Sequence, residues 1–106
     1  MAAVQPGHDP VDGIPADDLA GLRVRIDAID DELVGLLARR YAVTRAVGRY
    51  KAEHGMPPSD AVREAEVEAK VRRLAAAYGL SADLVGEVIR TVVADVVREH
   101  TELREA

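Results

Sequence analysis

The longest regular pattern of apolar positions runs from Leu19 to Lys51 and predicts one long helix. Successive positions are separated alternately by three and four residues, the spacing that aligns side chains along one face of a helix. One position on this face is charged, because Arg40 falls where the spacing requires an apolar residue. A face of this kind predicts packing against other helices. Its positions are Leu19, Leu22, Ile26, Ile29, Leu33, Leu36, Arg40, Val43, Val47 and Tyr50.

Capping and breaking residues predict the two ends of this helix. Asp17 or Asp18 supplies an N-cap, and Gly55 followed by two prolines ends the helix near Glu53. Such a helix is roughly 55 Å long at about 1.5 Å per residue, whereas a compact domain of this size has a radius of gyration of about 13 Å. One chain has difficulty covering both sides of it. We therefore expect a dimer that pairs the long helices.

Two shorter helices are predicted in the second half of the chain. The first begins at Ser59 or Asp60 and ends at Gly79, and the second opens after the N-cap Ser81. The predicted fold class is therefore all-α, with one long and two shorter helices in a helical homodimer. The apolar positions are Val67, Val71, Leu74 and Tyr78 in the first, reaching Glu64 and Asp60 backwards, and Val85, Ile89, Val92, Val96 and Leu103 with His100 in the second.

The N-terminal segment differs in composition from the rest. Residues 1–16 contain three of the five prolines and two glycines. A segment with so little apolar surface cannot offset its ordering entropy, so we expect a flexible leader before a helical domain at 17–106. Neither a secretory signal nor a bilayer-spanning apolar run is recognisable, and we expect a soluble cytoplasmic protein without a membrane partner.

Composition and charge exclude several classes of function. The 106 residues include no Cys, which excludes disulfides, thiolate zinc sites and cysteine nucleophiles. The three histidines have no metal-ligand spacing, so no metal is expected. A formal net charge of -5 argues against a general nucleic-acid binder, which normally has a basic face.

The charged position on the long apolar face points to a bound anion. A guanidinium does not lose its proton in a protein, so a buried Arg40 has to meet an anion. Lys51 lies eleven residues later, about 16 Å along the same face. Asp60, Arg63 and Glu64 join this cluster if the second helix folds back. Such a set suits a small dianion, and a reaction there would use positioning and fixed electrostatics rather than a nucleophile.

The sequence resembles the all-helical class of chorismate mutases over about residues 19–103. The resemblance implies an intertwined homodimer that rearranges chorismate to prephenate, at the entry to phenylalanine and tyrosine synthesis, without a cofactor. The reaction is a concerted Claisen rearrangement, in which the enzyme restrains the substrate and places positive charge against its ether oxygen. The segments that carry the resemblance, in the family's order and spacing, are LRVRIDAIDDELVGLLARR, AVGRYK, SDAVREAEV and GLSADLVGEVIRTVVADVV.

The resemblance also implies roles for individual residues. Arg23 reaches into the partner subunit's site to hold a carboxylate, and Arg40 holds the second carboxylate. Lys51 contacts a carboxylate and the ether oxygen. Asp60, through its backbone N–H, and Glu64 bind the ring hydroxyl.

Three further positions complete the implied site. Arg63 lies beside the ring carboxylate. His100 stands where the family commonly has Gln or Glu as second donor to the ether oxygen, and Val96 stands where a hydroxyl residue is frequent. A neutral His can donate one hydrogen bond, so we expect His100 to act there. Each of these residues also has a purely structural explanation. His100 would be a buried structural histidine, the arginines would be solvated helix charges, Asp60 would be only an N-cap, and Lys51 would only complement the helix dipole.

Two other functions stay open at this point. His100 and the stretch RYKA favour a relative with the same pocket, either an aminodeoxychorismate mutase or an isochorismate-pyruvate lyase. A non-catalytic helical dimerisation module would explain the apolar faces but not the charges on them. Some short family members are weak alone and are activated by the enzyme that opens the shikimate pathway, so the need for such a partner stays open as well.

Overall fold

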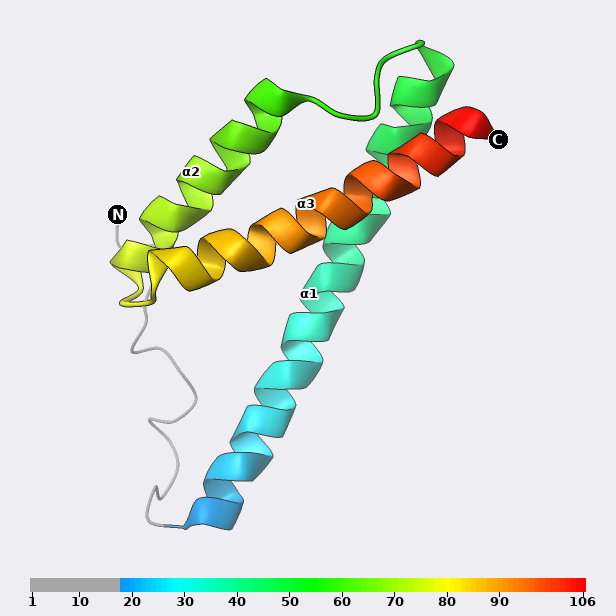
Figure 1. Cartoon of the computed structure of the whole chain (residues 1–106). Coiled ribbons are helices and arrows are strands. Elements are labelled where there is room, and N and C mark those ends of the chain that lie inside the picture. The colour runs from blue at the N-terminus through cyan, green and yellow to red at the C-terminus, as the bar shows by residue number, and fades with distance from the viewer. Residues whose placement is uncertain (1–17) are drawn as a thin grey trace. The chain divides into compact units, whose positions relative to one another are not determined.

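The computed structural model describes residues 18–106, which form three helices and no strand. They are α1 (Leu19–Glu53), α2 (Ala61–Ala77) and α3 (Ala82–Glu105) (Figure 1). The all-α prediction and the order of one long and two shorter helices are confirmed. The flexible leader predicted for residues 1–16, and Asp17 as an alternative cap, lie outside the described residues.

The predicted helix starts agree with the structure. The Asp18 carboxylate accepts the backbone N–H of Ala20 at 3.0 Å at the start of α1. Asp60 is the N-cap of α2 and Ser81 is the N-cap of α3, each with a side-chain oxygen that accepts a backbone N–H of the first turn. Each cap satisfies an amide that has no partner within its helix.

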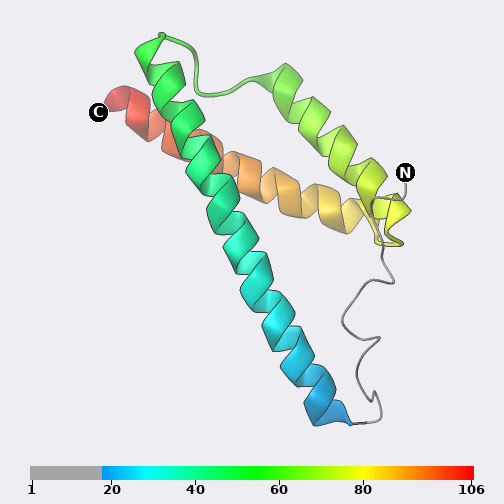
Figure 2. The same cartoon turned by 180° about the vertical axis from the view of Figure 1, so that it is seen from behind.

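The junction between α2 and α3 is a tight reversal. Gly79 has a φ of +75°, the left-handed conformation predicted for it. The N–H of Leu80 donates to Ala75 and the N–H of Gly79 donates to Ala76, which is the Schellman pattern at a helix end. Because the chain turns back at once, α2 packs against α3. Figure 2 shows from behind how the two helices meet at this turn.

The described chain consists of two compact units, divided within α1 after Arg40. The unit from Tyr41 to Ala106 holds the end of α1 together with α2 and α3. Its buried side chains are small or medium-sized and include Ala75 and Val96. In the unit that ends at Arg40, the described residues are Asp18 and the part of α1 up to Arg40.

The apolar face of α1 is largely exposed in the single chain. Leu33 and Leu36 each retain 55% of their accessible surface, and Val43 retains 64%. Leu22 and Ile29 are half-buried. The sequence pattern identified a face suited to packing, but packing within the described residues of one chain does not cover it.

Candidate functional site

Lys51 is held at the carboxyl end of α1 by a backbone carbonyl and an imidazole nitrogen. Its Nζ donates to the backbone carbonyl of Pro58 at 3.0 Å and lies 3.3 Å from Nδ1 of His100. The Pro58 contact holds the connection to α2 against the end of α1. An ammonium has three N–H donors, so these two contacts leave one for a ligand.

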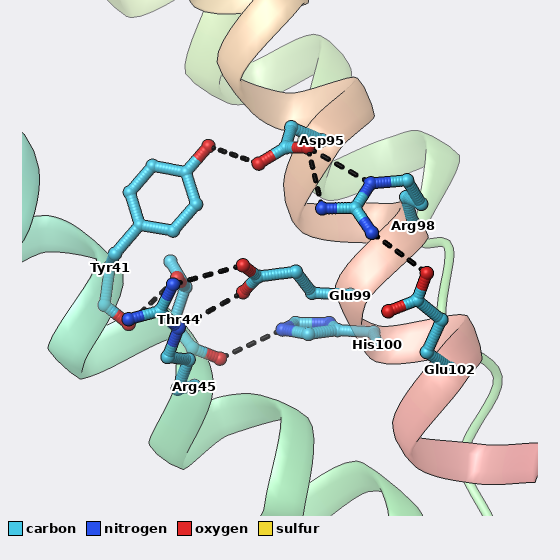
Figure 3. Close-up of polar contacts among 8 residues, drawn as sticks. All are labelled: Tyr41, Thr44, Arg45, Asp95, Arg98, Glu99, His100 and Glu102. Carbon is cyan, nitrogen blue, oxygen red and sulfur yellow. Dashed lines mark hydrogen bonds and ion pairs between the residues drawn. The ribbon is translucent and has the colours of Figure 1, made fainter.

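His100 lies in the interface between α3 and the end of α1. Only 4% of its surface is accessible, and its Nε2 lies 2.8 Å from the carbonyl oxygen of Thr44 (Figure 3). Gly48 makes this close approach possible, because a Cβ atom at that position would stand 2.6 Å from Cδ2 of the ring. The imidazole is therefore fixed by α1 on the side of Thr44 and Gly48.

No carboxylate neutralises Lys51 among the residues that the structure describes. Its nearby polar partners are a carbonyl and an imidazole, and no Asp or Glu of residues 18–106 lies within ion-pair distance of Nζ. Lys51 is also half-buried, so water screens its charge less than at an open surface. The site thus presents positive charge without a counter-ion from the described part of the chain.

The first turn of α2 brings together a second group of predicted residues. Oδ1 of Asp60 accepts the backbone N–H of Arg63 at 3.0 Å. One oxygen of Glu64, Oε2, accepts both the backbone N–H of Asp60 and the hydroxyl of Ser59, each at 3.0 Å. Oε1 of Glu64 is left as an acceptor. The exposed Arg63 side chain lies 3.8 Å from the Glu66 carboxylate.

Glu64 also lines an open groove of about 670 Å³ between α2 and α3. Neither Lys51 nor His100 lines this groove, so it is not a pocket that unites the predicted residues. The Arg90 guanidinium forms an ion pair with Glu68 in its wall. The lining residues are Ser59, Glu64, Ala65, Glu68, Ile89, Arg90, Val93, Ala94 and Val97.

The remaining predicted residues take no part in these two groups of contacts. Arg23 is exposed and Arg40 is half-buried on α1, and neither forms a hydrogen bond or ion pair with a described residue. Val96, one turn before His100 on α3, is 8% exposed and belongs to the core of its unit. The structure thus joins Lys51 with His100 and leaves both arginines without partners in residues 18–106.

A polar clamp formed by Tyr41 and Arg45, which flank Thr44 in α1, fastens α3 to α1 (Figure 3). The Tyr41 hydroxyl donates to Asp95 at 2.8 Å, and Arg45 donates two hydrogen bonds to Glu99 at 3.2 and 3.0 Å. The Tyr41 hydroxyl, followed by the Arg98 guanidinium, holds the pKa of the Asp95 carboxyl below its usual range. The hydrogen bond from Arg45 lowers the pKa of Glu99 in the same way. These contacts set the register of the helices on which His100 and Lys51 lie.

Sequence reasoning missed the groups that hold the two predicted side chains. The acceptors at Thr44 and Pro58 are backbone carbonyls, which carry no signature in the residue type. Gly48 did offer a signal, because a glycine inside a helix costs about 1 kcal/mol relative to alanine and usually has a packing reason. In this chain the reason is the ring of His100.

Within residues 18–106, no cluster of three or more His, Asp or Glu side chains is placed to hold a metal ion. A search of the same residues finds no helix with the length and apolar character needed to cross a membrane.

Comparison with known proteins identifies the family of the chain. Residues 22–101 match the family model described as chorismate mutase type II. The chain is 38% identical over 76 residues to the T-protein of Enterobacter agglomerans, which covers 72% of the chain and 20% of that protein. It is 30% identical over 99 residues to a 4-amino-4-deoxychorismate mutase of Streptomyces pristinaespiralis, covering 92% and 77%. It is 25% identical over 75 residues to a chorismate mutase of Methanocaldococcus jannaschii, covering 71% and 76%.

The chain spans about a fifth of the length of the T-proteins that it matches. The family match covers most of the described helices, from the first turn of α1 to the last turns of α3. The chain therefore belongs to the chorismate mutase type II family, a family of isomerases.

Proposed function

We propose that this chain rearranges chorismate to prephenate, a step of phenylalanine and tyrosine synthesis. In this reaction one carbon–carbon bond forms as the ether carbon–oxygen bond breaks, and no proton has to be transferred. The chain would therefore supply no acid, base or cofactor. Its contribution would be to restrain the substrate and to stabilise the negative charge that develops on the ether oxygen.

The observation that carries this proposal is the uncompensated positive charge of Lys51. The Pro58 carbonyl and the His100 imidazole contact its ammonium, and neither is a carboxylate that would cancel its charge. A structural lysine would be expected to find a carboxylate or open solvent, and Lys51 finds neither a described carboxylate nor full exposure. An oriented, half-buried cation of this kind suits a dicarboxylate substrate whose charge moves toward an ether oxygen during the reaction.

The other site residues have proposed roles that follow from the family. Arg40 would bind one carboxylate of the substrate, and Arg63 would lie beside the ring carboxylate. Glu64 would accept the ring hydroxyl through Oε1, the oxygen that its contacts with Ser59 and Asp60 leave open. The backbone N–H of Asp60 is already engaged by Glu64, so its proposed contact with the same hydroxyl requires that bond to be shared.

A second copy of the chain is part of the proposal. We infer that the exposed apolar face of α1 pairs with its counterpart in an intertwined homodimer, in which Arg23 enters the partner subunit's site. Side chains such as Leu33, Leu36 and Val43 support this pairing because each leaves more than half of its surface exposed. Burying such surface contributes about 25 cal/mol per Å², which provides a driving force for association. The cytoplasmic location and an activating shikimate-pathway enzyme stay predictions.

A second substrate is favoured by one specific comparison. The 4-amino-4-deoxychorismate mutase of Streptomyces pristinaespiralis aligns with 92% of this chain and with 77% of its own length. The T-proteins, although more identical, are matched over about a fifth of their length. Rearrangement of 4-amino-4-deoxychorismate is therefore the second candidate function. The two substrates differ at the ring substituent that Glu64 and Asp60 are proposed to bind.

The test is a side-by-side assay of chorismate, 4-amino-4-deoxychorismate and isochorismate with the purified protein. We expect turnover of chorismate with the largest kcat/KM of the three. Faster turnover of the amino substrate would replace the first candidate by the second, and pyruvate release from isochorismate would identify a lyase.

A binding control separates an enzyme from a helical dimerisation module. A transition-state analogue of the rearrangement should raise the melting temperature of the protein, because a ligand specific for the native state stabilises it. A folded dimer that turns over none of the substrates, and whose melting temperature ignores the analogue, would overturn the enzymatic proposal.

A further inference from the structure

We propose that His100 is a positioning residue for Lys51, and that it acts as a neutral imidazole with its proton on Nε2. This role differs from a direct hydrogen bond to the ether oxygen of the substrate. The inference rests on the proposed function for its kinetic consequence. Its structural part, the tautomer and the contact with Lys51, stands independently of which substrate is used.

The chemistry of the two partners determines the tautomer. A carbonyl oxygen only accepts hydrogen bonds, so the 2.8 Å contact with Thr44 requires a proton on Nε2. An ammonium only donates, so the 3.3 Å contact with Lys51 requires a lone pair on Nδ1. Only the neutral Nε2–H imidazole satisfies both contacts. A doubly protonated ring would turn an N–H toward the Lys51 ammonium and repel it.

The surroundings of His100 leave its ring few alternatives. The side chain is 4% exposed, and the backbone of α1 at Gly48 lies so near that a Cβ atom there would stand 2.6 Å from Cδ2 and 3.0 Å from Nε2. Both ring nitrogens are engaged within the chain, so neither is left for a substrate in this arrangement. The ring therefore relays the fixed position of the Thr44 carbonyl to the Lys51 ammonium.

This arrangement defines the direction of the remaining Lys51 donor. Pro58 and His100 occupy two of the three ammonium N–H groups, and both are neutral, so the third can contact an anionic substrate with the full charge behind it. Without His100, the ammonium would keep its charge but lose one of two orienting contacts. A small misplacement of a charged group can lower a rate by about 100-fold.

The structural part is tested by ¹⁵N NMR of the histidine rings at about pH 8, where imidazole side chains are generally neutral. Each of the three histidines is assigned by single substitution. We expect His100 to show a pyrrole-type Nε2 and a pyridine-type Nδ1. In Lys51→Met, the Nδ1 signal should move further toward that of a free pyridine-type nitrogen while Nε2 stays unchanged. An Nδ1–H tautomer, a doubly protonated ring, or an Nδ1 signal insensitive to Lys51→Met would overturn the proposal.

The kinetic part compares two replacements of similar size. In His100→Asn the amide oxygen can take the place of Nδ1 and accept from Lys51, whereas His100→Leu removes every acceptor. We expect kcat of the Leu variant to be at least about tenfold below that of the Asn variant, with KM changed much less. His54→Asn, at an exposed histidine whose Nδ1 contacts Tyr50, is the control and should keep wild-type kcat.

Stability runs in the opposite direction and therefore separates positioning from folding. Leucine suits the buried apolar face of α3 better than asparagine, so His100→Leu should melt at the same or a higher temperature than His100→Asn. Equal kcat in the two variants, or kcat values that follow the melting temperatures, would show a structural role and overturn the proposal. Absence of turnover in the wild type would refute the proposed function, while the NMR result would still decide the position of His100.

Discussion

The surroundings of Lys51 and the segment of α1 that ends at Arg40 differ in how their charged side chains are partnered. Around Lys51, the side chains contact partners from the same chain: His100 contacts the Thr44 carbonyl, and the ammonium contacts Pro58 and His100. In residues 18–40, Arg23 and Arg40 form no hydrogen bond or ion pair with a described residue. Apolar side chains there, such as Leu33, are more than half exposed.

The difference shows which groups one chain provides with partners by folding, and which groups remain for a ligand or a second chain to contact. The Lys51 region is preorganised, and preorganised charge stabilises a transition state without reorganisation during the reaction. The arginines and the apolar face of residues 18–40 are of the kind that a dicarboxylate ligand and a second copy of the chain would satisfy. In the proposed enzyme, Lys51 would be positioned by its own chain, whereas the arginines and the apolar face of residues 18–40 would need a ligand or a second chain.

The largest expected effect on activity is at Arg40, in the segment of residues 18–40. Arg40→Ala should lower kcat/KM by about 1000-fold, because it removes a charge-assisted contact to a substrate carboxylate. Stability should change little, since Arg40 has no described partner to lose. Steady-state kinetics and the melting temperature measure the two quantities.

Arg39→Ala is the matched control, because Arg39 is the exposed neighbour of Arg40 on the same helix. It should retain kcat/KM within about twofold. A folded Arg40→Ala protein with nearly normal turnover would remove Arg40 from the site.

A smaller loss of activity is expected on replacement of Lys51. Lys51→Met keeps an unbranched side chain but removes the charge, and kcat should fall by about 100-fold because the developing charge loses its stabiliser. The only other lysine of the chain, Lys70, is exposed on α2, so Lys70→Met serves as the control. Similar rates in the two variants would contradict the role of Lys51.

Alanine substitutions at two glycines of α1, one in each region, should change the free energy of unfolding in opposite directions. Gly48→Ala places a Cβ against the ring of His100, and we expect a loss of about 1–3 kcal/mol as the ring is displaced. Gly35→Ala meets nothing within 4 Å, so it should stabilise the helix by about 0.5–1 kcal/mol. Chemical denaturation measures both. Stabilisation by Gly48→Ala would show that the ring is not confined.

The smallest expected effect concerns acid stability of the clamp. The pKa values of Asp95 and Glu99 are held below the usual range in the folded chain, so the folded state binds fewer protons than the unfolded state. Their contribution is complete above the ordinary carboxyl pKa and is lost as pH falls through the lowered folded values. The melting temperature should therefore fall with acidification below about pH 4.

Replacing both clamp carboxylates, Asp95→Asn with Glu99→Gln, should flatten this dependence. A matched control replaces Glu87 and Glu105 by Gln, two exposed carboxylates of α3 that form no ion pair with a described residue. An unchanged acid slope in the clamp variant would show that the lowered pKa values do not contribute to stability.

Most of the helical framework was predictable from local sequence signals. Asp60 and Ser81 are caps because their side chains reach a nearby amide, and Gly79 ends a helix because its backbone adopts a positive φ. These effects act over a few residues, which a sequence displays directly. The alternation of apolar positions likewise identified the face of α1, although it did not reveal how little of that face one chain covers.

The sequence identified candidate site residues, whose roles stay predictions, but it did not identify their contacts. Lys51 and His100 were both named from the sequence, and the structure brings them within 3.3 Å. The Thr44 carbonyl that orients His100 lies 56 residues away along the chain, and backbone acceptors have no residue signature. The engagement of both imidazole nitrogens therefore depends on the packing of α3 against the end of α1, which the sequence does not display.

The most direct test of the account mixes two inactive variants. If Arg23 completes the partner subunit's site, then a dimer of one Arg23→Ala chain and one Arg40→Ala chain contains one intact site. Random reassociation of equal amounts gives about half mixed dimers, so about a quarter of wild-type turnover should return after unfolding and refolding together. Turnover that stays at the level of the separate variants, with mixed dimers demonstrated by a tag, would contradict a site shared between two copies.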